Sequence, residues 1–290
     1  MRRILILRGG ALGDFLVTLP AIAVLRERWP DAEIDLVGNA VAAALGVQAG
    51  LLTRVESQHG QLWSELYNAA PLSEDLEARL AAYDLVLSYW PDPDGDLRRR
   101  FPLHPHQRFL SDPAHPLVAP AAAHYCAPLM ALGLKTDRFL YPLAAPAGRP
   151  TGIALHPGSG STRKNWPLEH WSTLARWLRA EWSHELFVIS GECEPAGLLS
   201  DSGQPWRSLP LNELLNRLAS CRLFIGHDSG ISHLAAAAGA PCVLLFGPTD
   251  PRIWAPPGPR IAVVQHEPAM ESITLGQVQA AVKAALGDQR

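Results

Sequence analysis

Short apolar segments alternate with amphipathic segments along most of this 290-residue chain. Apolar runs bounded by turn residues predict buried strands, whereas apolar residues three and four positions apart predict helices. Strands are predicted at residues 4–7, 34–37, 85–87, 153–156, 186–189, 223–225 and 243–246. Helices are predicted up to residue 28 after the first strand, at 61–68, 74–82, 168–178 and 211–218, up to residue 238, and at 275–286. The pattern is that of an α/β protein.

The order of these segments predicts parallel sheets. The chain opens with strand, glycine turn, helix and strand, which is one βαβ unit. In the second half, apolar strands separated by amphipathic helices predict a parallel sheet that helices cover on both faces. Such sheets bind ligands beyond the carboxyl ends of their strands. The turns that follow the strands are therefore the places where chemistry is expected.

The length of the chain predicts two domains, because it is about twice the usual size of one. Prolines and small residues in the segment 142–150 favour an extended connector. We therefore predict two Rossmann-like domains facing a cleft, at residues 1–145 and 146–290. Residues 90–120 contain many prolines and polar residues and are predicted to have little regular structure.

Composition narrows the function. The formal net charge of -3 argues against a general nucleic-acid binder, which carries a strong basic excess. The four cysteines lie far apart without metal-ligand spacing, and nothing resembles an export signal, so a cytoplasmic location fits best. No apolar run reaches the ~18 to 20 residues that a membrane-spanning helix needs. Contact with the inner membrane surface, if any, is expected to be peripheral.

The strongest candidate site follows the strand at 223–225. There, Asp228, Ser229 and Gly230 form a polar turn, a helix of small residues starts at once, and His233 lies in its first turn. Asp228 or Ser229 can cap that helix, whose free N–H groups and positive dipole end suit a diphosphate. A plain helix cap explains the Asp and Ser but not the polar run from His227 to His233, so the functional interpretation is favoured.

A second candidate is the segment 155–166, which follows the strand at 153–156. Its glycines, including Gly160, let the backbone approach a ligand, while Ser159 and Ser161 add hydroxyl groups. Arg163 and Lys164 add positive charge, which makes a phosphate cradle, although the order of a Walker P-loop is absent. Taken alone, a flexible polar loop is an equally good interpretation.

The third candidate is the turn from Arg8 to Asp14 after the first strand, which includes Gly13. A dinucleotide-binding fingerprint would place an acidic residue at the end of the second strand, where Gly38 and Asn39 stand, so a dehydrogenase is disfavoured. Asp14 can act as a helix cap, and it could also accept a proton from an attacking hydroxyl. On this segment alone the cap is the safer interpretation.

Weaker signals remain open. Glu192 and Glu194 follow the strand at 186–189, where a carboxylate could bind a ribose. The basic segment 98–108, with Arg99 at its centre, could meet an anionic acceptor or lipid headgroups, although basic runs are more often solvated surface. The aspartates at 92, 94 and 96 look metal-like, but the glutamate of an EF-hand loop is missing, so a solvated turn is expected.

Together these motifs resemble glycosyltransferase family nine, the bacterial lipopolysaccharide heptosyltransferases. The resemblance rests on residues 8–14, on residues 156–159 with Lys164 and Trp166, and on residues 228–233 followed by 247–251, which include Thr249. It covers nearly the whole chain. Gly9 and Gly10 stand where many members of the family carry serine or threonine.

The resemblance implies a B-type glycosyltransferase fold, with the acceptor in the N-terminal domain and the nucleotide sugar in the C-terminal one. Asp14 then matches the general base and Lys164 the phosphate-binding lysine. Ser159 and Ser161 fall near the diphosphate, and residues 228–233 match the donor-binding turn. The remaining candidate acceptor or loop positions are Arg8, Gly13 and Arg99.

The implied reaction moves a heptose from ADP-heptose, with inversion, to a hydroxyl of a glycan or glycolipid acceptor. No metal or other cofactor is expected, since the nucleotide sugar is a substrate. Two alternatives stay open: a nucleotide-sugar epimerase of the same architecture, and a non-catalytic nucleotide-sugar-binding protein.

Overall fold

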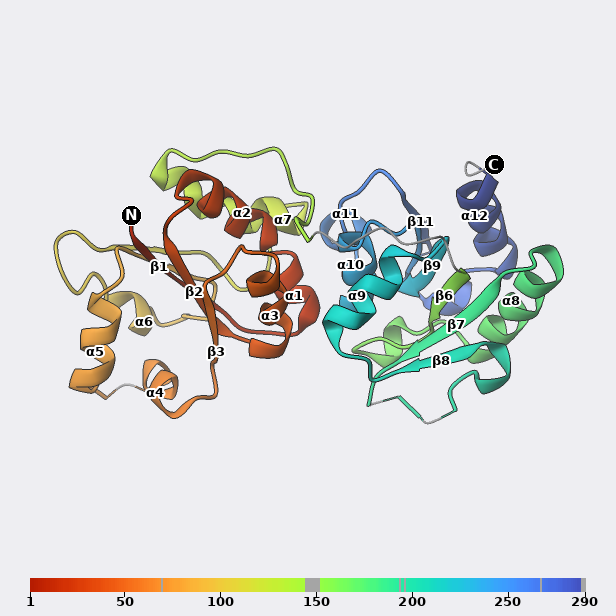
Figure 1. Cartoon of the computed structure of the whole chain (residues 1–290), viewed down its shortest axis with the longest axis horizontal. Helices are drawn as coiled ribbons and strands as arrows, with labels where there is room; N and C mark the ends of the chain where they lie inside the picture. The colour runs from red at the N-terminus through yellow and green to blue at the C-terminus, as the bar shows by residue number, and fades with distance from the viewer. Residues whose placement is uncertain (69, 144–151, 193, 196, 267, 288–290) are drawn as a thin grey trace. The chain divides into compact units, whose positions relative to one another are not determined.

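The chain consists of two compact units, Met1–Pro142 and Leu143–Arg290. The computed structural model describes residues 1–68, 70–143, 152–192, 194–195, 197–266 and 268–287. The predicted connector lies mostly outside these residues, because the description stops at 143 and resumes at 152. Each unit is an α/β domain with its own sheet, as predicted (Figure 1).

The first unit is built on a parallel five-stranded sheet. Its strands are β1 (Arg3–Arg8), β2 (Glu33–Gly38), β3 (Arg54–Ser57), β4 (Leu85–Ser88) and β5 (Arg108–Ser111). Their order across the sheet is β3-β2-β1-β4-β5, with all neighbours parallel. This is the strand order of a Rossmann domain, in which the direction of winding reverses between β1 and β4.

Helices cover both faces of this sheet. They are α1 (Leu12–Leu16), α2 (Leu19–Arg28), α3 (Ala40–Gln48), α4 (Gln61–Ser64), α5 (Glu74–Ala81), α6 (Asp96–Arg99) and α7 (Ala121–Cys126), with short 3-10 turns at Glu65–Tyr67 and Ala127–Leu132. Leu5 and Leu7 of β1 pack with Trp63 of α4 and Leu76 of α5. Since side chains alternate along a strand, the equally buried Ile4 and Ile6 point to the opposite face.

The second unit repeats the same topology with one more strand. Its strands are β6 (Gly152–His156), β7 (Glu185–Ser190), β8 (Gln204–Arg207), β9 (Leu223–His227), β10 (Cys242–Phe246) and β11 (Ile261–Gln265). Their order is β11-β10-β9-β6-β7-β8, and every pair of neighbours is parallel. The direction of winding reverses between β6 and β9.

The helices of the second unit are α8 (Leu168–Glu181), α9 (Leu211–Ala219), α10 (Gly230–Ala237), α11 (Pro251–Trp254) and α12 (Leu275–Gly287), with 3-10 turns at Thr162–Lys164, Ser200–Ser202 and Met270–Ser272. Trp171 of α8 and Val282 of α12 pack onto Ile153 and Ile225 of the sheet. Gly239, with φ of +76°, ends α10 where the sequence predicted a stop. No helix in the described part of the chain is long and apolar enough to cross a membrane.

The central strands were predicted correctly, but the four outermost strands were not. β3, β5, β8 and β11 lie at the edges of the two sheets and carry mostly half-buried or exposed residues. An edge strand lacks a neighbour on one side, so its sequence need not be a continuous apolar run. Residues 90–120, predicted to have little regular structure, contain only the short elements α6 and β5, which the sequence did not predict.

The first predicted helix is also divided in two. α1 ends at Leu16, and α2 begins at Leu19 with Pro20 in its first turn. Proline lacks an N–H group and has a fixed φ, so it suits the start of a helix and disrupts the interior. The break leaves Thr18 beside β1, where its hydroxyl contributes to the candidate site.

Gly38 lies where the backbones of β1 and β2 come close together. A Cβ atom at this position would lie 1.7 Å from the backbone oxygen of Arg8, its register partner on β1. We expect Gly38→Ala to lower the free energy of unfolding by roughly 3 kcal/mol, because backbone cannot yield as a side chain does. Chemical denaturation measures the change.

Gly276→Ala is the control for that experiment. Gly276 lies in the first turn of α12 and is exposed, and a Cβ atom at this position would meet no other atom within 4 Å among the described residues. Alanine there should leave stability unchanged or raise it by up to about 1 kcal/mol, because alanine favours helix. Equal effects of the two substitutions would contradict the close-approach argument.

Candidate functional site

Both sheets place their candidate residues at the point where the direction of winding reverses. In parallel sheets of this topology, ligands bind beyond the carboxyl ends of the strands at that point. In the first unit the turn after β1 carries Asp14, and in the second the loops after β6 and β9 carry Lys164 and Asp228.

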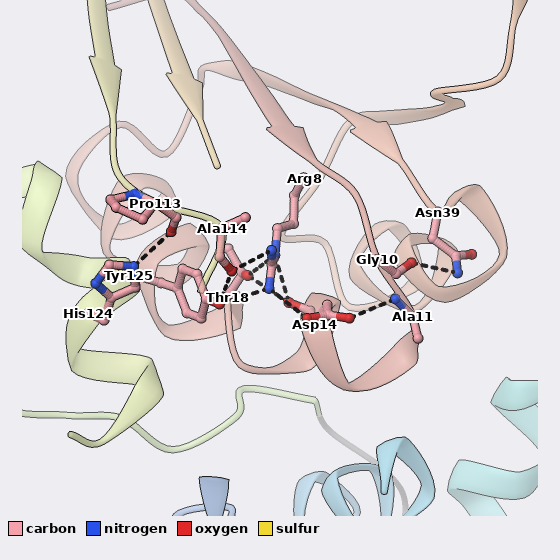
Figure 2. Close-up of polar contacts among 10 residues, drawn as sticks. All are labelled: Arg8, Gly10, Ala11, Asp14, Thr18, Asn39, Pro113, Ala114, His124 and Tyr125. Atoms are coloured by element: carbon pink, nitrogen blue, oxygen red, sulfur yellow. Dashed lines mark hydrogen bonds and ion pairs between the residues drawn. The ribbon is translucent and has the colours of Figure 1, made fainter. Parts of the chain in front are cut away.

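Asp14 lies in the first turn of α1, held by contacts to both of its carboxylate oxygens (Figure 2). Oδ2 accepts a hydrogen bond from the backbone N of Ala11 at 2.8 Å, and Oδ1 accepts one from Arg8 Nη2 at 3.1 Å. The side chain is 37% exposed, so the carboxylate remains accessible while its position is fixed. Asp14 thus caps α1, as the cautious interpretation expected, and still faces solvent.

The conformation of Gly10 makes room for this carboxylate. Its φ of +95° lies in the region that favours glycine, and a Cβ there would sit 2.4 Å from Asp14 Oδ2. Asn39 donates to the backbone oxygen of Gly10 at 3.2 Å and ties the turn to the end of β2. Gly10 is thus required by the position of Asp14. Gly13 lies within α1.

Arg8 is the hub of the contacts around Asp14. Its guanidinium is only 3% exposed, and besides Asp14 it donates to Thr18 Oγ1 at 3.1 Å and Tyr125 OH at 3.0 Å (Figure 2). Its carbon Cζ lies 4.6 Å from the centre of the Tyr125 ring. Tyr125 OH in turn donates to the backbone oxygen of Ala114. Arg8 therefore joins β1, α1 and the segment before α7 rather than presenting its charge to solvent.

In the second unit, Lys164 and Asp228 form an ion pair that joins the two strongest sequence candidates. Lys164 Nζ lies 2.6 Å from Asp228 Oδ2, and the side chains are 30% and 9% exposed. β6 and β9 are neighbouring strands, so the loops that follow them meet at one edge of the sheet. The sequence predicted both residues, but it did not predict that they pair.

His227, at the end of β9, holds the loop that carries Lys164. Its Nε2 accepts the backbone N–H of Trp166 at 2.9 Å, so its Nδ1 bears the proton and donates to the backbone oxygen of Gly158 at 3.3 Å. Burial, with a smaller effect of neighbouring His156, lowers the pKa of His227 to about 3. The neutral imidazole therefore connects both ends of the loop at physiological pH.

The start of α10 is capped by Ser229. Its hydroxyl accepts the backbone N–H of Ser232 and lies 3.4 Å from Nδ1 of His156. Burial lowers the pKa of His156 to about 4, so this ring is also neutral. Of the two caps that the sequence allowed, Ser229 is thus the one used, which leaves Asp228 to pair with Lys164. Gly230 begins α10, and His233 is buried within it.

The other predicted donor-side residues lie on the loops around this pair. Ser159 Oγ lies 2.7 Å from the backbone oxygen of Ser161 and 2.6 Å from Asn165 Oδ1, so its hydroxyl shapes the loop. Ser161 precedes the 3-10 turn that contains Lys164, and Gly160 has open space around it. Thr249, after β10, has a buried Oγ1 without a hydrogen-bond partner among the residues that the structure describes.

Glu192 and Glu194 differ in their surroundings. Glu192 is exposed, whereas Glu194 Oε2 accepts the backbone N–H of Gly191 at 2.7 Å. A Cβ at Gly158 would lie 2.3 Å from Glu194 Oε1, so this carboxylate rests against the Lys164 loop. Of the two acidic residues, Glu194 is the one that borders the candidate site.

The basic segment 98–108 is not a single loop. Arg99 lies on α6, is exposed, and pairs with Asp96 of the same helix, while Arg108 begins β5. Asp92 accepts the backbone N–H groups of Leu97 and Arg98 and caps α6, as a solvated turn would. Within the described ranges, no group of three or more His, Cys, Asp or Glu residues could hold a metal ion.

Sequence reasoning missed two contributors in the first unit, Thr18 and Tyr125. Both are buried and contact Arg8 through their hydroxyl groups. Thr18 stands inside what was predicted as one continuous helix, and Tyr125 lies more than a hundred positions from Arg8. For Thr18, the nearby Pro20 was the only sequence signal that the helix breaks there. No local pattern indicated Tyr125.

Comparison with known proteins identifies the family. The sequence profile of glycosyltransferase family 9 (heptosyltransferase) matches residues 131–282, just over half of the chain. Lipopolysaccharide heptosyltransferase 1 of Pseudomonas aeruginosa is 28% identical over 284 residues, which cover 86% of this chain and 79% of the relative.

Solved structures agree on the fold. A family 9 glycosyltransferase from Veillonella parvula superposes with a TM-score of 0.80 at 17% identity, covering 99% of this chain and 98% of that one. The E. coli heptosyltransferase WaaC with ADP gives a TM-score of 0.74 at 19% identity, covering 98% and 99%. The predicted B-type fold is therefore confirmed. With its two Rossmann-like sheets and the matching profile, this chain belongs to glycosyltransferase family 9, the heptosyltransferase family.

Proposed function

We propose that this enzyme transfers a heptose from ADP-heptose to a hydroxyl group of a glycan or glycolipid acceptor in lipopolysaccharide core assembly. The observation that carries the proposal is the Lys164–Asp228 pair at the reversal point of the second sheet. A lysine there, beside the capped start of α10, is suited to a diphosphate. Curated relatives with heptosyltransferase activity support the transfer of a heptose over epimerisation.

In the proposed reaction, Asp14 is the general base. Its carboxylate takes the proton of the acceptor hydroxyl as that oxygen forms a bond to the anomeric carbon of the donor. The bond from the anomeric carbon to the phosphate oxygen breaks, and ADP leaves with its electron pair. Because the acceptor attacks the face opposite the leaving group, the anomeric configuration inverts. The contacts of Arg8 and Ala11 with Asp14 keep its carboxylate in one orientation.

The leaving diphosphate is stabilised by the second unit. Lys164 supplies a positive charge, and the first turn of α10 supplies backbone N–H groups that have no partner within the helix. Ser159, Ser161 and Thr249 belong to the loops around this charge. These fixed groups can do what a divalent ion does in other transferases, so we propose that no metal takes part. The enzyme is proposed to act at the cytoplasmic face of the inner membrane, with at most peripheral contact.

The donor assignment is tested by thermal shift of the purified protein with ADP, UDP, GDP, dTDP and CMP, each with and without EDTA. A ligand that binds the native state raises the melting temperature, by an amount set by its concentration and affinity. We expect ADP alone to raise it, and the shift to survive EDTA. A response to UDP or dTDP only would replace the donor, and loss of the ADP shift in EDTA would contradict metal independence.

Replacing Asp14 separates catalysis from binding. Asp14→Asn keeps the shape and the Ala11 contact but removes the base, so we expect kcat to fall by roughly 10² to 10⁴. The shift with ADP should stay unchanged, because Asp14 lies in the other unit. Asp31→Asn, which alters an exposed carboxylate in the same unit, is the matched control and should keep full activity. Wild-type turnover by Asp14→Asn would show that the base assignment is wrong.

Replacing Lys164 tests the leaving-group role. Lys164→Met removes the charge that faces the diphosphate and leaves Asp228 unpaired, so kcat should drop by about 10² to 10³ and ADP affinity should weaken too. Lys135→Met removes an exposed lysine and serves as the control. Steady-state kinetics and ADP titration provide both readouts. A Lys164→Met enzyme with normal kcat would place the stabilising charge elsewhere.

One further assay distinguishes the proposed transferase from an epimerase and from a non-catalytic binding protein. A transferase releases ADP only when an acceptor is present, whereas an epimerase consumes the donor without one. Measuring both the conversion of ADP-heptose and the release of ADP, with and without acceptor, therefore separates these two. A protein that binds the donor tightly but neither converts it nor releases ADP would be a non-catalytic binding protein.

A further inference from the structure

Two buried hydroxyl groups hold the guanidinium of Arg8. Thr18 Oγ1 lies 3.1 Å from Nε of Arg8, and Tyr125 OH lies 3.0 Å from Nη2. Thr18 lies at the break between α1 and α2, whereas Tyr125 belongs to α7, and both are 0% exposed. Neither side chain can touch a substrate, so any effect on the reaction must pass through Arg8.

The proton of each hydroxyl is used elsewhere, so each one accepts from Arg8. Tyr125 OH donates to the backbone oxygen of Ala114 at 2.8 Å. Thr18 Oγ1 donates to the backbone oxygen of Asp14, also at 2.8 Å. Burial raises the pKa of Tyr125, and the opposing effect of Arg8 is smaller, so the phenol keeps its proton at neutral pH. Both hydroxyls thus present lone pairs to the guanidinium in fixed directions (Figure 2).

The Nη2 group of Arg8 has two protons and two partners, Tyr125 OH at 3.0 Å and Asp14 Oδ1 at 3.1 Å. A guanidinium is planar and its N–H groups have fixed directions, so the bond to Tyr125 sets the direction of the N–H that faces Asp14. Nη1 makes a longer contact of 3.5 Å with the backbone oxygen of Ala114, and Nε contacts the backbone oxygen of Asp14 and Thr18 Oγ1. Among the described residues, the carboxylate of Asp14 thus contacts Arg8 through Nη2 alone.

We propose that Tyr125 is a positioning residue of the transfer reaction, because its hydroxyl fixes the guanidinium of Arg8, which in turn fixes the carboxylate of Asp14. The inference rests on the proposed function, in which Asp14 takes the proton of the acceptor. Without the Tyr125 hydroxyl, one N–H of a buried cation loses its partner, and the guanidinium turns toward another acceptor. The carboxylate is then held by Ala11 through Oδ2 and can rotate about that bond. Thr18 fixes Nε in the same way.

Tyr125→Phe removes the hydroxyl and keeps the ring. We expect kcat to fall by about 10-fold, because a small displacement of a reacting group can cost up to about 10²-fold in rate. The KM for ADP-heptose and the thermal shift with ADP should stay unchanged, since the proposed donor-binding residues belong to the other unit. Steady-state kinetics at saturating acceptor measures both constants. Wild-type kcat in Tyr125→Phe would falsify the proposal.

Tyr83→Phe is the matched control. Tyr83 is 1% exposed, and its hydroxyl donates to Asp35 Oδ2 at 2.8 Å in the same unit. Its ring lies against Arg3 at the amino end of β1, whereas Arg8 ends that strand. The control therefore loses the same atom from an equally buried phenol at the opposite end of the strand. We expect wild-type kcat even where the melting temperature falls. A loss of kcat equal to that of Tyr125→Phe would reflect general loosening of the unit and would contradict a positioning role.

Two substitutions at Thr18 test the second hydroxyl. Thr18→Ser retains the hydroxyl and should keep kcat within about 2-fold of the wild type, whereas Thr18→Val keeps the shape, removes the hydroxyl and should lower kcat by about 10-fold. The comparison isolates the hydroxyl because both variants alter the same buried position. Equal kcat values for the two variants would contradict positioning through Arg8.

Combining Tyr125→Phe with Asp14→Asn separates positioning from a general structural role. If Tyr125 acts through the carboxylate of Asp14, its hydroxyl has no base left to position in the Asp14→Asn enzyme. The second substitution should then lower the remaining kcat by less than about 2-fold, so the two effects are not additive in free energy. A further loss of about 10-fold would show that Tyr125 acts independently of the base, and the proposal would fail.

Asp14→Asn by itself distinguishes this inference from the proposed function. Wild-type turnover by that variant overturns the base assignment, and the positioning role of Tyr125 with it. A large loss of kcat in Asp14→Asn together with wild-type kcat in Tyr125→Phe overturns the positioning role alone. The melting temperature of each variant without ligand confirms that it is folded.

Discussion

The reversal of strand order at the centre of each parallel sheet is the constraint on which the rest of the molecule depends. Two neighbouring strands whose following helices leave toward opposite faces cannot both cover the edge between them, so the loops there stay open to a ligand. β1 and β4 make that opening in the first unit, and β6 and β9 make it in the second. The proposed base Asp14, the proposed phosphate-binding Lys164 and the capped start of α10 all lie on a loop or helix start next to one of these pairs.

Each opening holds one charged pair, but the two pairs differ in what surrounds them. In the first unit the cation, Arg8, is buried and the carboxylate, Asp14, is the exposed partner; in the second the carboxylate, Asp228, is buried and Lys164 is more exposed. A buried charge without its partner lowers the stability of the folded protein. The buried Arg8 therefore holds Asp14 in place, and the buried Asp228 holds Lys164 in place. The result is an oriented base in one unit and an oriented cation in the other.

The burial of each strand explains why some elements were predicted from the sequence and others were not. Strands such as β1 and β9 are buried on both faces, so their apolar runs are visible in the sequence. β5 has an exposed arginine and three half-buried residues, and it was taken for part of a loop. Arg8 and Tyr125 meet only through tertiary packing, which no short motif encodes.

Asp14 shows that a structural and a catalytic interpretation of one residue need not compete. As the third residue of α1 it returns to the backbone N–H of Ala11, which is what a helix start requires. That bond uses Oδ2, and Arg8 lies on the side of Oδ1, so the carboxylate cannot rotate without losing one of the two contacts. A carboxylate oxygen has two lone pairs, so an oxygen that accepts one N–H can still take up a proton. The cap therefore provides the fixed geometry that a general base needs, and the two roles are carried by the same contacts.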